Sequence, residues 1–162
     1  MAEPFDSYPE KLRQSSNSEA PFFHRAADLF AVRGPVPESV KSRVSAIIEE
    51  GQYAVCRGAP AAEVDCVPVY RLEGGALPAV ATGLVYVRFA EGISAADRGA
   101  DLLAAGYRIE RVPPYAPHTA WVIAADGNAA RGLGEIGKLM SLPGVAHVEP
   151  QMLMPKTARG AL

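Results

Sequence analysis

The sequence LVYVRFA at residues 84–90 is the starting point for the structure that we expect for the second half of the chain. It is rich in β-branched and aromatic residues, which favour strands. Its side chains alternate between an apolar set and a mixed set, namely Val85, Val87 and Phe89 against Tyr86 and Arg88. Because successive side chains of a strand point to opposite faces, this stretch predicts a strand with one buried and one exposed face.

The segments that follow this strand predict a regular order of elements. Ser94 and Asp97 have the spacing of a helix start signal, Gly106 marks a helix end, and Asn128 closes a turn that can cap a second helix. The second helix carries apolar residues at the spacing i, i+3 and i+7. The predicted elements are a strand at 84–90, a helix at 94–106, strands at 107–112 and 119–125, a helix from 128 to about 140, and a strand at 145–149.

This order, β-α-β-β-α-β, predicts an α+β fold of the ferredoxin-like, split βαβ type. Right-handed crossovers then place two helices on one face of a four-stranded antiparallel sheet and leave the other face open. The alternation puts Tyr86, Arg88, His147 and Glu149 on the open face. Such a face suits a protein partner, although an ordinary solvated face, or one covered by residues 21–72, fits the same pattern.

The first half is expected to be a less organised extension. Residues 1–20 are polar and predict a disordered arm, and residues 21–80 predict a helical extension with short strands. Within it we expect helices at 21–32 and 38–50, the second because Val40, Val44, Ile47 and Ile48 follow a helical apolar stripe, and strands at 53–56 and 67–72.

Composition excludes several classes of function. The chain has 162 residues, a net charge of −2 and 21% charged residues, so a nucleic-acid partner is not expected. No apolar run approaches the ~20 residues that span a bilayer. The first twenty residues lack the apolar core of a secretion signal, so we expect a cytoplasmic protein without a membrane partner.

The sequence shows no pattern of an active site, a cofactor site or a metal site. His24, His118 and His147 are scattered singly, and Cys56 and Cys66 lack further ligands at zinc-binding spacing. Two reduced thiols are expected, with a redox disulfide as the alternative. No phosphate-binding glycine motif occurs. We therefore expect a protein that is not an enzyme.

Two stretches, YVRFAEGIS at 86–94 and SLPGVAHVEPQMLM at 141–154, resemble the propeptide domain of subtilisin-like serine proteases and the free inhibitors built on that domain. The resemblance extends over residues 83–157, and the closing motif PGVAHVEP is its specific part. It implies a propeptide-like domain at 81–151 followed by an inhibitory tail at 152–162, in a 1:1 heterodimer with the protease.

The resemblance also implies roles for individual residues. In the family the open sheet face packs on two protease helices and acidic groups cap them, a role that falls on Glu149. The tail lies in the active-site cleft like a substrate. The tail residues are Met152, Leu153, Met154, Pro155, Lys156 and Thr157. Pro155 makes the adjacent bond hard to cleave, which suits an inhibitor.

The sequence thus predicts a cytoplasmic propeptide-like inhibitor, and folding chaperone, of a subtilisin-type serine protease. The alternative is a ferredoxin-like module that senses a small molecule and needs no tail. Deletion of the tail discriminates between the two, since only the inhibitor depends on it.

Overall fold

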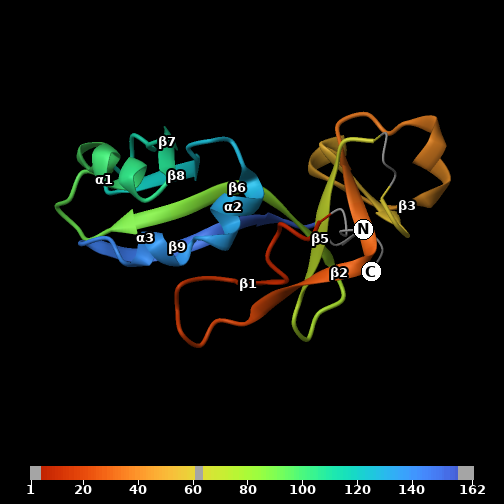
Figure 1. Cartoon of the computed structure of the whole chain (residues 1–162), viewed down its shortest axis with the longest axis horizontal. Coiled ribbons are helices and arrows are strands. Elements are labelled where there is room, and N and C mark those ends of the chain that lie inside the picture. Colours follow the sequence, from red (N-terminus) through yellow and green to blue (C-terminus); the bar gives the residue numbers. More distant parts are fainter. Residues whose placement is uncertain (1–4, 61–63, 157–162) are drawn as a thin grey trace.

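A computed structural model describes residues 5–60 and 64–156, and these form one large antiparallel sheet (Figure 1). The strands lie in the order β3-β4-β2-β5-β6-β8-β7, with β1 added to β2 and β9 added to β6. The strands are β1 Lys11–Arg13, β2 Phe22–Arg33, β3 Val44–Ile48, β4 Tyr53–Arg57, β5 Cys66–Leu72, β6 Pro78–Phe89, β7 Tyr107–Arg111, β8 Thr119–Ala124 and β9 Val145–Leu153. The helices are η1 Glu38–Arg43, η2 Glu49–Gly51, η3 Ala95–Arg98, α1 Gly99–Ala104, α2 Ala129–Gly134 and α3 Gly137–Met140.

The predicted ferredoxin-like class, a four-stranded α+β domain with a helical extension, is wrong. Strands make up 43% of the described residues and helices 19%, and the sheet that these residues form has nine strands. The reason lies in β6 and β9, which are longer than the sequence pattern indicated. β6 begins at Pro78 and pairs with β5 before it reaches β8, and β9 continues to Leu153. Both strands run from the part of the molecule that carries the helices to the part built from β2, β3 and β5 (Figure 1).

β6 contains a bend at Gly83. Gly83 has a positive φ of 96°, and the pairing of β6 with β9 shifts register between Ala81 and Val85. The Thr82 hydroxyl accepts a hydrogen bond from the Leu84 amide and donates one to the Gln151 side chain. Every second residue from Ala81 to Phe89 is buried, but Ala79 and Val80 are buried as well, so the part of β6 before Ala81 lacks the alternation that marks a half-buried strand.

The local order of elements after residue 84 agrees with the prediction, although the helices are short. Asn128 caps α2 as expected, with its side chain accepting from the Arg131 amide at 3.1 Å. Ser94 does not act as a side-chain cap, because no cap hydrogen bond joins it to η3.

The helices predicted at 21–32 and 38–50 are wrong. Residues 22–33 form β2, which is paired on one edge with β4 and on the other with β5. The second segment is a short 3-10 helix followed by β3. Ile48 is fully buried while Ile47 is 50% exposed, which is the alternation of a strand. The strands predicted at 53–56 and 67–72 are confirmed as β4 and β5.

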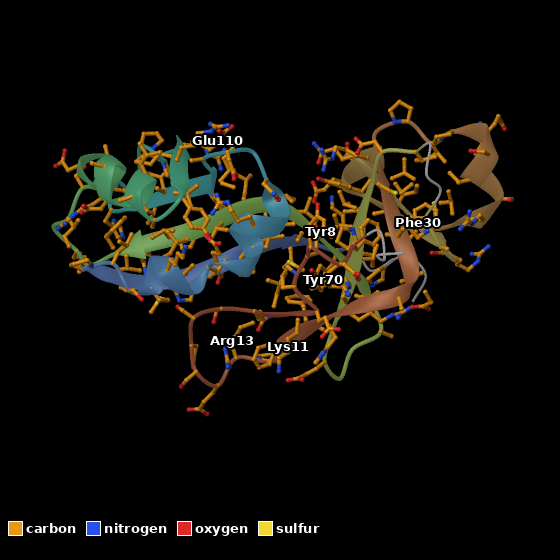
Figure 2. The ribbon with its side chains drawn as sticks, in the orientation of Figure 1. Tyr8, Lys11, Arg13, Phe30, Tyr70 and Glu110 are labelled. Carbon is orange, nitrogen blue, oxygen red and sulfur yellow. The ribbon has the colours of Figure 1, made fainter. Side chains whose placement is uncertain are left out.

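The arm that was expected to be disordered is tied to the fold over its described part, which begins at residue 5. β1 pairs with β2, and Leu12 is buried. The hydroxyl of buried Tyr70 donates to the Pro9 carbonyl at 2.7 Å, and the guanidinium of Arg25 donates to the carbonyl of Tyr8 at the same distance. Figure 2 shows Tyr8 and Tyr70 close together where the arm meets β5.

One face of the β6–β9 region is the hydrophobic core that the alternation predicted. Val85, Val87 and Phe89 are buried together with Leu102 of α1 and Leu139 of α3. Burying an aliphatic or aromatic side chain stabilises the fold by about 1.5–3 kcal/mol. Both helical segments therefore pack on this face, and the residues between the buried ones point the other way.

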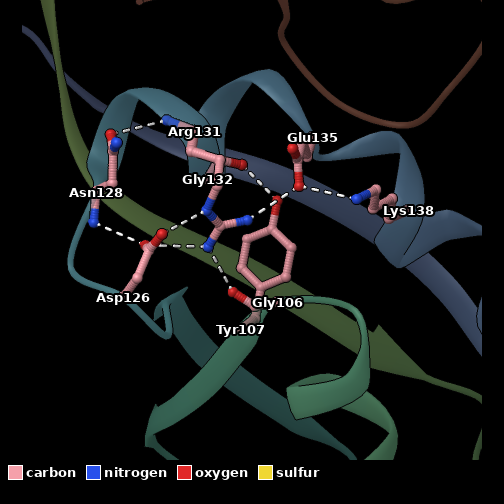
Figure 3. Close-up of polar contacts among 8 residues, drawn as sticks. All are labelled: Gly106, Tyr107, Asp126, Asn128, Arg131, Gly132, Glu135 and Lys138. Carbon is pink, nitrogen blue, oxygen red and sulfur yellow. Dashed lines mark hydrogen bonds and ion pairs between the residues drawn. The ribbon is translucent and has the colours of Figure 1, made fainter.

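A polar cluster fixes α2 over β7 and β8 (Figure 3). The Arg131 guanidinium donates to the Asp126 carboxylate at 2.9 Å, to Glu135 at 2.9 Å and to the Gly106 carbonyl at 2.8 Å. The buried Tyr107 hydroxyl donates to the Gly132 carbonyl. Desolvation raises the pKa of Tyr107 to about 12, so this hydroxyl keeps its proton and stays a donor.

Candidate protein-binding face

Four residues form a continuous row across the face of the sheet opposite the helices. Arg111 of β7 lies opposite Trp121 of β8, Trp121 opposite Tyr86 of β6, and Tyr86 opposite Glu149 of β9. The row therefore has two aromatic rings at its centre and a charge of opposite sign at each end. We call Arg111, Trp121, Tyr86 and Glu149, with the neighbouring Arg88 and His147, the outer face.

The rings of the outer face contact one another rather than the core. The Tyr86 and Trp121 ring centroids are 5.3 Å apart with an interplanar angle of 57°, and the Tyr86 and His147 centroids are 6.3 Å apart. The Arg111 guanidinium lies 6.0 Å from the Trp121 centroid. Aromatic pairs and cation–π contacts of this geometry hold the side chains in place, and all three rings are half-buried.

The structure brings together all four face residues that the sequence predicted. Arg88 lies opposite His147, and Tyr86 opposite Glu149. His147 Nε2 and Glu149 Oε2 are 2.9 Å apart, with 25% and 45% of the two side chains exposed. Glu149 is thus accessible, but in the free chain its carboxylate already has a partner.

Trp121, which the sequence alone identifies only as a core or a sheet-face residue, is also a member of the outer face. The signal was present, because Trp121 alternates with Ala120 and Val122, both of which are fully buried. A half-buried tryptophan beside a tyrosine and an arginine has the composition typical of the energetic centre of a protein interface.

No helix in the described ranges, 5–60 and 64–156, packs on the outer face. The core cluster beneath the helices takes its strand residues from the opposite set of alternating positions. Strands β2 to β5 extend the sheet from the edge of β6 rather than lying over it. The two arginines of the outer face are exposed, and its other four residues are half-buried.

The predicted tail is largely part of the sheet. Met152 and Leu153 belong to β9 and pair with Ala81 and Val80 of β6. Met154 follows the strand and packs against the buried cluster around Phe23. Pro155 is half-buried and Lys156 is exposed, while Thr157 lies outside the described residues.

Ser16, His147 and Glu149 are connected in the order of a hydrolytic triad, but their hydrogen bonds do not suit a nucleophile. Ser16 Oγ lies 3.4 Å from His147 Nδ1 and accepts a shorter bond, 2.9 Å, from the Val148 amide. The Ser16 amide itself donates to the Val148 carbonyl at 2.8 Å, so it is not available to stabilise an oxyanion. The arrangement fastens two segments of the chain together.

Among the described residues no cluster of histidine, cysteine or carboxylate side chains could hold a metal ion. His24 pairs with Glu73 at 3.0 Å on the surface, which lowers the pKa of that carboxyl. In the same part of the chain, no helix has the length and apolar character required to cross a bilayer.

The two cysteines are separated by a strand. Cys56 on β4 and Cys66 on β5 flank β2, and both are free thiols. Adjacent strands are about 4.8 Å apart, so the two Cα atoms lie beyond the ~7 Å limit of a disulfide. The reduced state expected from the sequence is the one that this geometry permits.

Comparison with known proteins adds no relative: no family model, no curated protein and no solved structure matches this chain.

Proposed function

We propose that this chain is a propeptide-like inhibitor of a subtilisin-type serine protease and holds the protease through the outer face. The observation that carries the proposal is the row formed by Arg111, Trp121, Tyr86 and Glu149 on a face that no described helix covers. Aromatic and arginine side chains are enriched among the residues that dominate binding energy in protein interfaces.

The position of the closing motif supports this proposal. PGVAHVEP contributes the first part of β9, and its single acidic residue, Glu149, ends the aromatic row. A carboxylate at the border of an apolar patch can accept from the unpaired amides at the start of a partner helix. Glu149 is 45% exposed and can turn from His147 toward such a partner.

In this proposal the tail residues up to Met154 and those from Pro155 onward have different roles. Met152 and Leu153 are held by pairing with β6 and Met154 by packing, so these residues contribute to the fold of the inhibitor. Entry into the active-site cleft then falls to the residues from Pro155 onward. The outer face supplies most of the affinity, and the tail blocks the cleft.

A titration of purified subtilisin tests the proposal. The intact chain, the Trp121→Ala variant and a chain that ends at Met154 are each titrated against a fixed enzyme concentration. Tyr115→Ala is the matched control, because Tyr115 is an aromatic residue with 89% exposure that belongs to the loop between β7 and β8 and is not a member of the outer face.

We expect stoichiometric inhibition by the intact chain and by Tyr115→Ala. Removal of a central interface aromatic costs roughly 2 kcal/mol or more, so Trp121→Ala is expected to weaken inhibition at least about thirtyfold. The shortened chain should bind and inhibit less completely. Absence of inhibition by the intact chain, with several subtilisins, would refute the proposed function.

A further inference from the structure

The loop between β1 and β2 lies against the open edge of β9. We call residues 14–20 the strap. Its ends are joined by the Gln14 amide, which donates to the Pro21 carbonyl at 2.9 Å, and Arg13 donates to two strap carbonyls, those of Ser18 and Ala20. The strap is thus a compact loop with hydrogen bonds of its own.

Ser16 fastens the strap to β9. Its amide donates to the Val148 carbonyl at 2.8 Å, and its hydroxyl oxygen accepts from the Val148 amide at 2.9 Å. A single residue therefore satisfies both backbone groups that Val148 turns away from β6, with the hydroxyl in the place of a strand carbonyl. Unpaired groups at a sheet edge invite pairing with another chain, and Ser16 closes this edge.

The hydrogen-bond network links Ser16 to the outer face. Because the Ser16 oxygen accepts from Val148, its own O–H is free to donate to His147 Nδ1, 3.4 Å away. That ring nitrogen must then carry a lone pair, which places the proton on Nε2. Nε2 donates to Glu149 Oε2 at 2.9 Å. The Glu149 carboxylate thus favours the histidine tautomer that holds Ser16.

We infer that Glu149 is a positioning residue for the strap and that a partner which takes Glu149 into its own contacts loosens Ser16 from β9. The second half of this inference rests on the proposed function. Loss of the Glu149 contact frees the imidazole to change tautomer and orientation. The Ser16 hydroxyl then loses its acceptor, and the edge of β9 opens at Val148.

We call the link from Glu149 through His147 to Ser16 the relay. Hydrogen exchange of single amides in the free chain tests it. We expect Glu149→Ala and Ser16→Ala each to speed exchange of the Val148 amide roughly three- to tenfold, the range that corresponds to loss of one hydrogen bond. The matched control is Glu73→Ala, which breaks the other His–Glu pair, with His24, away from the strap. The Val122 amide in β8 is the internal reference, because global unfolding accelerates both amides.

Three results in the free chain would each overturn the relay. The first is faster exchange of the Val148 amide in Ser16→Ala but not in Glu149→Ala, since Ser16 would then hold the edge of β9 without help from Glu149. The second is unchanged exchange of the Val148 amide in both variants, because the strap would then not protect the edge of β9. The third result is exchange of the Val148 amide that is accelerated equally in Glu73→Ala and Glu149→Ala, because the effect would then not depend on the contact of Glu149 with His147.

A second arm uses the full chain with active-site-blocked subtilisin. We expect faster exchange of the Ser16 amide together with slower exchange at Tyr86 and Trp121. Protection at Tyr86 and Trp121 with unchanged Ser16 exchange overturns the coupling and leaves the proposed function intact. No change at any amide is a failure of the proposed function, and the free-chain comparison still decides the relay.

Discussion

Tyr86 and Trp121 face each other across β6 and β8, with ring centroids 5.3 Å apart, on the side of the sheet away from the helices. Neither ring belongs to the buried core. The pair is supported from both sides, by Arg111 at Trp121 and by His147 at Tyr86. Two adjacent rings held in place before binding lose little side-chain freedom when a partner covers them.

The chain contains one tryptophan, so a label on that residue reports on the outer face alone. We predict that 5-fluorotryptophan at Trp121 gives a single fluorine resonance that shifts when active-site-blocked subtilisin is added. Tyr86→Ala should reduce the shift because it removes the neighbouring ring. A resonance that stays unchanged while the two proteins co-elute would place the interface elsewhere.

Tyr107→Phe is predicted to destabilise the fold by about 1–3 kcal/mol. The Tyr107 ring is fully buried, and its hydroxyl is the donor to the Gly132 carbonyl. The variant keeps the ring and leaves a buried carbonyl without that donor. Urea unfolding measures the change, and a loss below about 0.5 kcal/mol would show that solvent reaches the carbonyl.

The polar cluster around Arg131 should make stability depend on pH in the acid range. The hydrogen bond from Arg131 lowers the pKa of Asp126, and bonds from Lys138 and Arg131 lower the pKa of Glu135. A carboxyl whose pKa is lower in the folded state stabilises the fold fully above its unfolded pKa, about 4. That contribution is lost as pH falls through the folded pKa.

Thermal unfolding at pH 7 and pH 3 measures this dependence. Asp126→Asn should lower the midpoint at pH 7, and its difference from the wild type should shrink at pH 3. Glu110→Gln is the control, because Glu110 is an exposed carboxylate paired with Arg108 outside the cluster. If Asp126→Asn lowers the midpoint equally at both pH values, the ionised Asp126 carboxylate is not the source of the pH dependence.

Gly83→Ala is predicted to destabilise the chain by about 1–2 kcal/mol. Gly83 has a φ of 96°, and a Cβ there would lie 3.3 Å from the Cβ of Ala129. Gly134→Ala is the matched control, since an added Cβ meets nothing within 4 Å and this residue lies in a helix. The control is expected to be neutral or stabilising. Equal free energies of unfolding for the two variants would show that the bend in β6 is not strained by a side chain.

Oxidation is predicted to leave the monomer without an internal disulfide. Burial raises the pKa of both thiols, Cys56 and Cys66, so thiolate is scarce near neutral pH and reaction is slow. Cys66 is half-buried and Cys56 fully buried, so Cys66 should be alkylated first. Intact mass after mild oxidation and iodoacetamide treatment measures this, and a monomer lighter by two hydrogens would contradict it.

The sequence predicted the second half of the fold better than the first for a physical reason. Val85, Val87 and Phe89 keep a strict period of two against a single buried face, so the alternation is visible. The same alternation correctly grouped Tyr86, Arg88 and His147 on the outer face. The extra length of β6 was not predicted because Ala79, Val80 and Ala81 are all buried, so the start of the strand has no period of two.

The first half was mispredicted because its order depends on pairing between distant segments. β2 has the sequence FFHRAADLFAVR, whose alanines and charges also suit a helix, and its pairing with β5 shifts register between Arg25 and Phe30. Pairing on both edges makes it a strand, a tertiary effect that outweighs local propensity. The contact of Ser16 with Val148 joins residues 132 positions apart and leaves no local signal.

That contact also bears on the synthesis of the protein. The strap, which lies near the start of the chain, completes its hydrogen bonds only on β9, and β6 gains its longest partner only when β9 has emerged. A ribosome makes about 5–20 residues per second, so the early strands wait for seconds with their edges unpaired. Chaperones that bind exposed strands would act during that interval, and the pairing of β9 with β6 ends their access.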